Sequence, residues 1–88
     1  MSNLALITGA SSGIGKEFAR YHAQKGGDLI ITARREAALS DLKNELESKH
    51  GITVHTIALD LASEGGARKL IDEVAARGLH VDILINNA

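Results

Sequence analysis

The feature that most constrains the fold is a regular alternation of short apolar runs with longer segments of helical periodicity. Four runs rich in Leu, Ile, Val and Thr span residues 4–7, 29–32, 53–59 and 81–85. Three segments with apolar residues at helical spacing lie between them, at residues 14–25, 36–49 and 63–78. Short continuous apolar runs are typical of strands buried on both faces of a parallel sheet. The order β-α-β-α-β-α-β therefore predicts an α/β fold, with a parallel sheet and flanking helices.

Two finer predictions concern how the helices pack and where they begin and end. Ile14, Phe18 and Tyr21 fall at i, i+4 and i+7, with Ala19 and Ala23 alongside, and we expect this stripe of the first helix to pack on the sheet. Ser63 is predicted to cap the third helix, because its hydroxyl can accept a hydrogen bond from a free backbone N–H. Glycines are expected to end the helices, at positions 26, 27, 51 and 78.

Composition excludes several classes of function. The 88 residues carry a net charge of −1, which gives no basic excess to bind nucleic acid or an anionic membrane. The chain has no cysteine, so it forms neither disulfides nor thiolate zinc sites, and this fits a reducing cytoplasm. No apolar run approaches the ~18 residues of a membrane span. The four histidines lack metal-ligand spacing and are expected at the surface or at helix ends. We therefore predict a cytoplasmic protein with no nucleic-acid, membrane or metal partner.

A glycine-rich segment between the first strand and the first helix is the most informative stretch. Residues 8–15 contain the spacing Gly-x-x-x-Gly-x-Gly, which is not that of a P-loop. Gly9 allows a sharp turn, Gly13 lets the backbone approach a pyrophosphate, and Gly15 allows close packing of helix and sheet. Free N–H groups at a helix start bind anions. The predicted nucleotide-binding residues of this loop are Gly9, Ser11, Ser12, Gly13, Ile14 and Gly15; the alternative is a glycine-rich turn without a ligand.

These features resemble the classical short-chain dehydrogenase/reductase family. Residues 8–15 are similar to its cofactor loop, Asp60 and Leu61 to its adenine-contacting pair, and residues 86–88 to the start of its Asn-Asn-Ala-Gly motif. The three motifs occur in the family's order, and the resemblance covers the whole chain. It implies a Rossmann-like sheet of which about half is present here. It also implies cofactor contacts from Asp60, Leu61, Asn87 and Ala88.

Two of these residues have structural alternatives. Asp60 is also placed to act as an acid near the start of the third helix, where a negative charge is favourable. Asn87 is also suited to joining neighbouring strands through its side-chain amide.

The end of the second strand indicates which nucleotide is preferred. Sheets that bind NAD usually place Asp or Glu about 20 residues after the glycine loop, to bind the ribose 2′-hydroxyl. This chain has Ala33 there, followed by Arg34 and Arg35. A guanidinium can bind a 2′-phosphate, whereas a carboxylate would repel it. We therefore predict NADP(H) over NAD(H), with Arg34 as the main ligand and Arg35 as a weaker candidate; the alternative is two solvated arginines. Family members with Ala-Arg at this point are similar in preferring NADP(H).

No catalytic residue is predicted within the chain. The family uses Tyr-x-x-x-Lys with an upstream Ser, and these residues normally lie well beyond Asn-Asn-Ala-Gly. Tyr21 and Lys25 have the Tyr-x-x-x-Lys spacing, but Tyr21 lies roughly 9 Å along a helix that runs away from the glycine loop, at 1.5 Å per residue. We therefore interpret this pair as a chance match.

Residues 1–88 are thus expected to form one dinucleotide-binding domain that is incomplete at its C-terminus. The leading hypothesis is the NADP(H)-binding portion of an oxidoreductase that transfers a hydride between NADP(H) and a carbonyl or alcohol. A small-molecule substrate would bind only in a longer chain. The alternatives are a non-catalytic dinucleotide-binding or partner-dependent module, and an inert truncation. Residues 81–85 would be an edge strand, through which we expect self-association.

Overall fold

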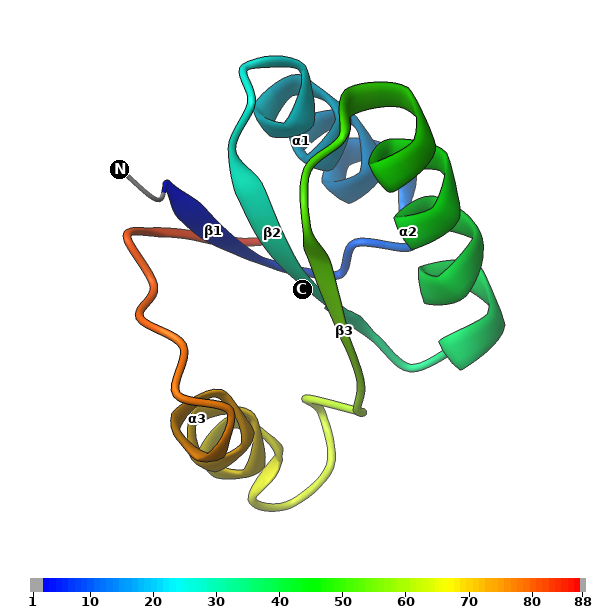
Figure 1. The fold of residues 1–88 in the computed structure, drawn as a ribbon. Coiled ribbons are helices and arrows are strands. Elements are labelled where there is room, and N and C mark those ends of the chain that lie inside the picture. Colours follow the sequence, from blue (N-terminus) through cyan, green and yellow to red (C-terminus); the bar gives the residue numbers. More distant parts are fainter. Residues whose placement is uncertain (1–2, 88) are drawn as a thin grey trace.

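A computed structural model describes residues 3–87 as a four-stranded parallel sheet with helices on both faces (Figure 1). The strands lie in the order β3-β2-β1-β4. In chain order the elements are β1 (Leu4–Thr8), α1 (Gly13–Gln24), β2 (Asp28–Ala33), α2 (Glu36–His50), β3 (Val54–Ala58), α3 (Gly66–Ala76) and β4 (Ile83–Asn86). The predicted fold class and order of elements are confirmed.

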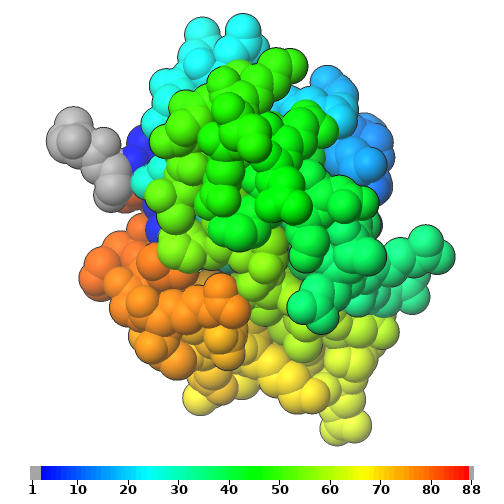
Figure 2. Space-filling model, turned by 45° about the vertical axis from the view of Figure 1, so that its right-hand side comes forward, coloured from blue at the N-terminus to red at the C-terminus, as the bar shows by residue number. Residues whose placement is uncertain are grey.

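The order of the strands explains the placement of the helices. The chain steps from β1 to β2 to β3 in one direction and then crosses back to β4 on the other side of β1. Because crossovers between parallel strands are right-handed, α1 and α2 cover one face and α3 covers the other (Figure 1). Figure 2 shows α2 in green and α3 in yellow to orange as separate masses of side chains.

Alternating residues of the strands supply two apolar cores. On one face Ala5 and Ile7 of β1 pack with α1 and α2, whose buried leucines are Leu39, Leu42 and Leu46. On the other face Leu4 and Leu6 pack with Leu70 of α3. Successive strand residues point to opposite faces, so a strand within the sheet must be apolar throughout. This explains the continuous apolar runs in the sequence.

The predicted packing stripe of α1 is wrong for its three large side chains, although Ala19 and Ala23 beside them are buried as expected. Ile14, Phe18 and Tyr21 are 65%, 43% and 62% exposed. The buried residues of α1 lie one position further along the helix, and they are Gly15, Ala19, His22 and Ala23. Small side chains allow the helix to lie close to the sheet, which leaves the larger apolar side chains outside this contact.

His22 lies in the last turn of α1, one of the two places expected for the histidines, but it is not at the surface. Its side chain is buried, and Nε2 lies 2.8 Å from the backbone oxygen of Asn3. A Cβ atom on Gly27 would lie 2.2 Å from Nε2, so the turn after α1 closes directly over the ring. This contact could not be predicted from local sequence patterns, because it depends on where the chain before β1 lies.

The start of α3 also differs from the prediction. Gly65, and not Ser63, is the N-cap, and it has a left-handed φ of 73°. The Ser63 backbone N–H and hydroxyl both donate to the backbone oxygen of Asp60, at 3.1 and 2.6 Å. The hydroxyl therefore stabilises the preceding turn and not the helix. The predicted ends after α1, α2 and α3 are confirmed, because positive φ angles follow each helix at Gly26, Gly51 and Gly78.

The fourth strand begins later than predicted, at Ile83. Asp82 joins the chain to β1 just before it: Leu4 N donates to Asp82 Oδ2 at 2.9 Å, and Asp82 N donates to the Leu4 oxygen at 2.8 Å. Among the helices of residues 3–87, none has the length and hydropathy needed to cross a bilayer.

Candidate functional site

A cleft of about 470 Å³ opens beyond the carboxyl ends of β1, β2 and β3. It brings together most of the predicted site residues from four separate segments of the chain. The residues that line it are Gly9, Ser11, Ser12, Thr32, Ala33, Arg34, Leu59, Asp60, Leu61, Ala62 and Asn87. This edge of an open parallel sheet, where the strand order reverses beside β1, is where such folds bind ligands.

The loop between β1 and α1 turns sharply at Gly9, whose φ is 64°. The Gly9 oxygen accepts hydrogen bonds from the Ser12 backbone N–H at 3.1 Å and the Ser12 hydroxyl at 2.8 Å. Ser12 is the N-cap of α1, and its Oγ accepts from Gly15 N at 3.4 Å. The Ser12 hydroxyl proton is therefore used inside the loop. Ser11 is exposed and forms no hydrogen bond within residues 3–87.

The two helix-side glycines of the loop have different surroundings. A Cβ atom on Gly15 would lie 2.3 Å from the Gly9 oxygen and 3.0 Å from Asn87 Nδ2. Gly15 is therefore required by the fold. The atoms that leave no room for a side chain there belong to the loop backbone and not to the sheet. A Cβ atom on Gly13 would meet nothing within 4 Å. No contact within the described part of the chain requires glycine at position 13.

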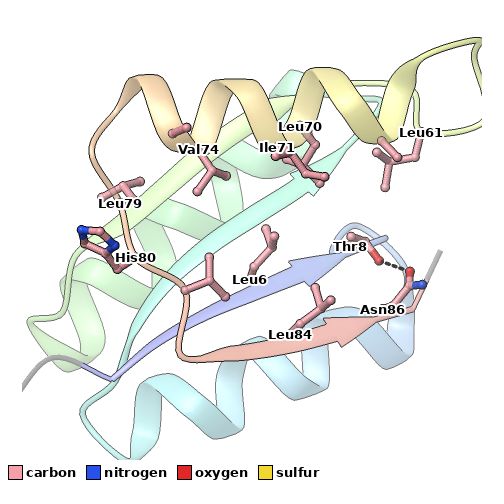
Figure 3. A pocket seen from close by; sticks show the side chains of 13 residues that line it. Leu6, Thr8, Leu61, Leu70, Ile71, Val74, Leu79, His80, Leu84 and Asn86 are labelled. Atoms are coloured by element: carbon pink, nitrogen blue, oxygen red, sulfur yellow. Dashed lines mark hydrogen bonds between the residues drawn. The ribbon is translucent and has the colours of Figure 1, made fainter.

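The end of β4 is hydrogen-bonded to the glycine loop. Asn87 Nδ2 donates to Ser12 Oγ at 2.9 Å and to the Gly9 oxygen at 3.4 Å. Thr8 Oγ1 donates to Asn86 Oδ1 at 2.9 Å and accepts from Asn87 N at 2.9 Å (Figure 3). The Asn87 side-chain amide therefore binds the glycine loop, and not a neighbouring strand as the structural alternative predicted.

Sequence analysis missed the positioning roles of Thr8 and Asn86. Their side chains meet because the two residues are directly paired in the parallel register of β1 and β4. The sequence does show a polar residue at the end of each of these two apolar strands. The contact between them could be predicted only by knowing that β4 lies beside β1 in the sheet.

Arg34 and Arg35 follow β2 but do not occupy equivalent places. Arg34 lines the cleft, whereas Arg35 is the N-cap of α2 and is absent from the cleft lining. Both are exposed, and neither takes part in an ion pair among the described residues. The charge of Arg34 is therefore available to an anion in the cleft.

Asp60 and Leu61 also line the cleft, just beyond the end of β3. Asp60 Oδ1 accepts from Ala62 N at 2.9 Å, which fixes the carboxylate in a turn. A Cβ atom on Gly66 would lie 2.6 Å from the backbone oxygen of Asp60, so the start of α3 packs directly against this segment. Gly66 is a third positioning residue that sequence analysis missed.

Gly13, Ile14 and Gly15 are also absent from the cleft lining. Gly13 and Ile14 border a shallow hollow on the exposed side of α1, beside Phe18 and Tyr21. Ala88 lies outside the described residues. Lys25 Nζ lies 5.4 Å from the centre of the Tyr21 ring, as a cation–π pair on α1. Across residues 3–87, no group of three His, Asp or Glu side chains is close enough to hold a metal ion.

Comparison with known proteins relates this geometry to one family. The model of the short chain dehydrogenase family matches residues 3–88. The chain is 43% identical to sulfoacetaldehyde reductase 2 of Chromohalobacter salexigens, over 100% of this chain and 34% of the relative. It is 48% identical to a very-long-chain 3-oxoacyl-CoA reductase of Pyrenophora tritici-repentis, over 94% of this chain and 25% of the relative.

Solved structures agree with this assignment. The L-sorbose reductase of Gluconobacter frateurii, in complex with NADPH and L-sorbose, superposes with a TM-score of 0.91 at 34% identity, over 99% of this chain and 33% of that one. A short-chain dehydrogenase of Sphingobium yanoikuyae in complex with NADPH gives a TM-score of 0.86 at 37% identity, over 98% and 33%. The chain thus spans about a quarter to a third of the length of these relatives. The glycine loop, the parallel sheet and the match over residues 3–88 together show that the chain belongs to the short-chain dehydrogenase family.

Proposed function

We propose that the chain is the NADP(H)-binding portion of a short-chain oxidoreductase. The observation that carries this proposal is the convergence of the glycine loop, Arg34 and the Asp60 segment on one cleft. The solved relatives from Gluconobacter frateurii and Sphingobium yanoikuyae are complexes with NADPH, which supports a nicotinamide dinucleotide as the ligand class.

The preference for a 2′-phosphate rests on Arg34. It is an exposed cleft residue with no ion-pair partner among residues 3–87, and Ala33 before it has no carboxylate to bind a ribose hydroxyl. A guanidinium binds phosphate through paired, charge-assisted hydrogen bonds. Arg35 lies on the helix side of this position, so we assign it the smaller contribution.

The pyrophosphate is proposed to lie against the start of α1. Gly13 has open space where a side chain would be, so the backbone there is accessible to a ligand. Ser11 can donate its free hydroxyl, and the N-terminal end of α1 favours an anion. Asp60 is proposed to accept from the adenine amino group and Leu61 to contact the ring, while Asn87 and Ala88 would lie on the ribose side.

Catalysis is proposed to belong to a longer protein. When bound, NADPH supplies the hydride, and carbonyl reduction also needs a proton donor beside it. The single Tyr of this chain, Tyr21, is exposed on α1 and does not line the cleft. This observation favours a second candidate for the 88-residue chain alone, namely a dinucleotide-binding module without catalysis.

The test is calorimetric titration of the 88-residue chain with NADPH and NADH. We expect tighter binding of NADPH. Arg34→Ala should weaken NADPH binding by about 10- to 100-fold, because a hydrogen bond to a charged group contributes about 1.5–3 kcal/mol. NADH binding should change little. Arg35→Ala is the matched control and should have the smaller effect. Equal losses for both nucleotides in Arg34→Ala would contradict the 2′-phosphate role.

A further inference from the structure

One side chain of β2 is both polar and completely buried, and it lies beside the candidate nucleotide site. Four consecutive residues of this strand have no exposed surface, namely Leu29, Ile30, Ile31 and Thr32. The first three are the apolar residues expected within a sheet, so the hydroxyl of Thr32 is the exception. Valine has the same branched shape, and a single hydrogen bond adds little net stability. Packing alone therefore does not explain a hydroxyl at position 32.

The Thr32 hydroxyl joins β2 to β3 near the carboxyl ends of both strands. Thr32 Oγ1 donates to the backbone oxygen of Ile57 at 2.7 Å, and this hydrogen bond is buried. The two residues are directly paired in the parallel register of β2 and β3. Just beyond them, Leu59 N donates to the Ala33 oxygen at 2.9 Å. The hydroxyl therefore fixes the position of one strand end relative to the other.

The backbone of Thr32 also holds the glycine loop, because Ala10 N donates to the Thr32 oxygen at 3.1 Å. Gly9, directly before Ala10, lines the cleft. Arg34, which follows Thr32 after one residue, lines it as well, and so does Asp60 just beyond the end of β3. Thr32 is thus hydrogen-bonded at the base of three segments that form the cleft.

The neighbour of Thr32 in the register of β1 and β2 is Thr8, and its surroundings differ. Thr8 lines a hollow of about 550 Å³ between α3 and β4, together with apolar side chains such as Ile71 (Figure 3). Thr32 is absent from the lining of this hollow and borders the nucleotide cleft. Because the Thr32 side chain is buried and its proton is donated to Ile57, we assign it no direct contact with a nucleotide.

The position of Arg34 depends on the end of β2. Arg34 directly follows this strand, and its exposed side chain forms no ion pair among residues 3–87. On the other side of it, Arg35 is the N-cap of α2 and makes no side-chain capping hydrogen bond. The hydrogen-bonded end of β2 is therefore the anchor from which Arg34 reaches the cleft.

We propose that Thr32 is a positioning residue for Arg34 and, through it, for the preference for a 2′-phosphate. The inference rests on the proposed binding of NADP(H) in the cleft. The hydrogen bond from Thr32 to Ile57 sets the spacing between Arg34 and the Asp60 segment, against which the adenine is proposed to lie. Paired hydrogen bonds between a guanidinium and a phosphate need a narrow geometry. A shift of the strand end would therefore weaken the phosphate contact more than the contacts that NADH shares.

The first experiment is calorimetric titration of Thr32→Val in the 88-residue chain. Its Kd for NADPH should rise about 3- to 10-fold, and its Kd for NADH by less than about 2-fold. Thr32→Ser keeps the hydroxyl and should keep the wild-type ratio of the two Kd values. Ile30→Val is the matched control for damage to the core, because Ile30 lies two residues earlier on the same face of β2. It should leave the ratio unchanged.

A double-mutant cycle tests whether Thr32 acts through Arg34. If it does, adding Thr32→Val to Arg34→Ala should leave the Kd for NADPH at the value of Arg34→Ala alone. If Thr32 acts independently, the two fold-changes should multiply.

A third measurement needs no nucleotide. Amide hydrogen exchange reports the two ends of the β2–β3 pair separately, because Leu59 N bonds to Ala33 at the carboxyl end and Leu29 N bonds to the Thr53 oxygen at the other. In Thr32→Val, exchange should become faster at Leu59 than in the wild type and stay unchanged at Leu29.

Several results would overturn the role of Thr32 while leaving NADP(H) binding intact. They are a wild-type ratio of Kd values in Thr32→Val, a lost ratio in Thr32→Ser, and multiplying losses in the double-mutant cycle. Unchanged exchange at Leu59 would overturn it whatever the nucleotide affinities. The measurement on Thr32→Ser applies even where Thr32→Val does not fold. By contrast, a wild-type chain that binds neither nucleotide, or equal losses for both in Arg34→Ala, would overturn the proposed function itself.

Discussion

The two edges of the sheet are built differently. At the β3 edge, Lys43 and Glu47 of α2 bind the outward-facing backbone of Val54, and three leucines of α2 close the core behind it. At the β4 edge no described strand lies beyond Ile83 and Leu84, and apolar side chains remain exposed on both faces. We call these the closed edge (β3 with Lys43 and Glu47) and the open edge (β4).

The candidate nucleotide site belongs mainly to the closed half of the molecule. The candidate nucleotide site is built from the segments that follow β1, β2 and β3, together with Asn87. Its walls are fixed by internal contacts, such as that of Gly15 with the Gly9 oxygen. Recognition of a nucleotide can therefore depend on the closed half.

The largest expected effect compares one substitution in the two halves. Leu39→Ala removes a fully buried side chain from the closed half and should cost about 2–5 kcal/mol of unfolding free energy. Leu84→Ala at the open edge should change it by about 0.5 kcal/mol or less, because the side chain is mostly exposed. Urea unfolding at a dilution where the chain is monomeric checks both values. Equal costs would contradict the distinction between the two halves.

The next effect separates the two glycines of the loop. Gly15→Ala should destabilise the fold by about 1–3 kcal/mol, since the new methyl group would overlap the Gly9 oxygen. Gly13→Ala should leave stability unchanged or slightly raised, because the methyl group meets open space. It should nevertheless weaken NADPH binding, if the backbone at Gly13 contacts the pyrophosphate. Thermal unfolding and calorimetric titration measure the two effects separately; unchanged NADPH affinity in Gly13→Ala would contradict the assigned phosphate position.

The smallest effect concerns the closed edge and pH. Hydrogen bonds from Lys43 and then from the Val54 N–H lower the pKa of the Glu47 carboxyl below its ordinary value. A carboxyl whose pKa is lowered in the folded state contributes stability above its unfolded pKa, about 4.3, and loses it as the pH falls through the folded value. The urea midpoint of the wild-type chain should therefore fall more between about pH 7 and pH 3 than that of Glu47→Gln. The pair is partly exposed, so the effect is small. Parallel pH profiles would show that Glu47 contributes nothing to this edge.

Sequence patterns predicted the elements and their order because strand and helix periodicities are local properties. The side of α1 that packs was mispredicted, because two stripes one residue apart were both apolar, and only the distance to the sheet selects the one with Ala19 and Ala23. The cap at Gly65 was missed because the Ser63 hydroxyl is used by the preceding turn. Such competition between hydrogen-bond partners is not visible in a linear sequence.

Only part of the candidate site was predicted, because some of its contacts join residues that are distant in sequence. Gly9, Arg34 and Asp60 were identified from their places after strands, and the structure places all three on one cleft. The hydrogen bonds of Thr8 and Asn87 join residues that are far apart in sequence. Their geometry required the register between β1 and β4, which no local pattern specifies.

The most direct test of NADP(H) binding in the cleft is an amide chemical-shift titration of the 88-residue chain with adenosine 2′,5′-bisphosphate, with 5′-AMP as the comparison. We expect saturable shifts at Gly9, Gly13, Arg34 and Leu61, with a lower Kd for the bisphosphate. The hollow between α3 and β4, reported by Ile71, should show no saturable shift. Saturable shifts confined to that hollow would contradict the cleft as the nucleotide site. Equal Kd values for the two nucleotides would contradict the preference for a 2′-phosphate.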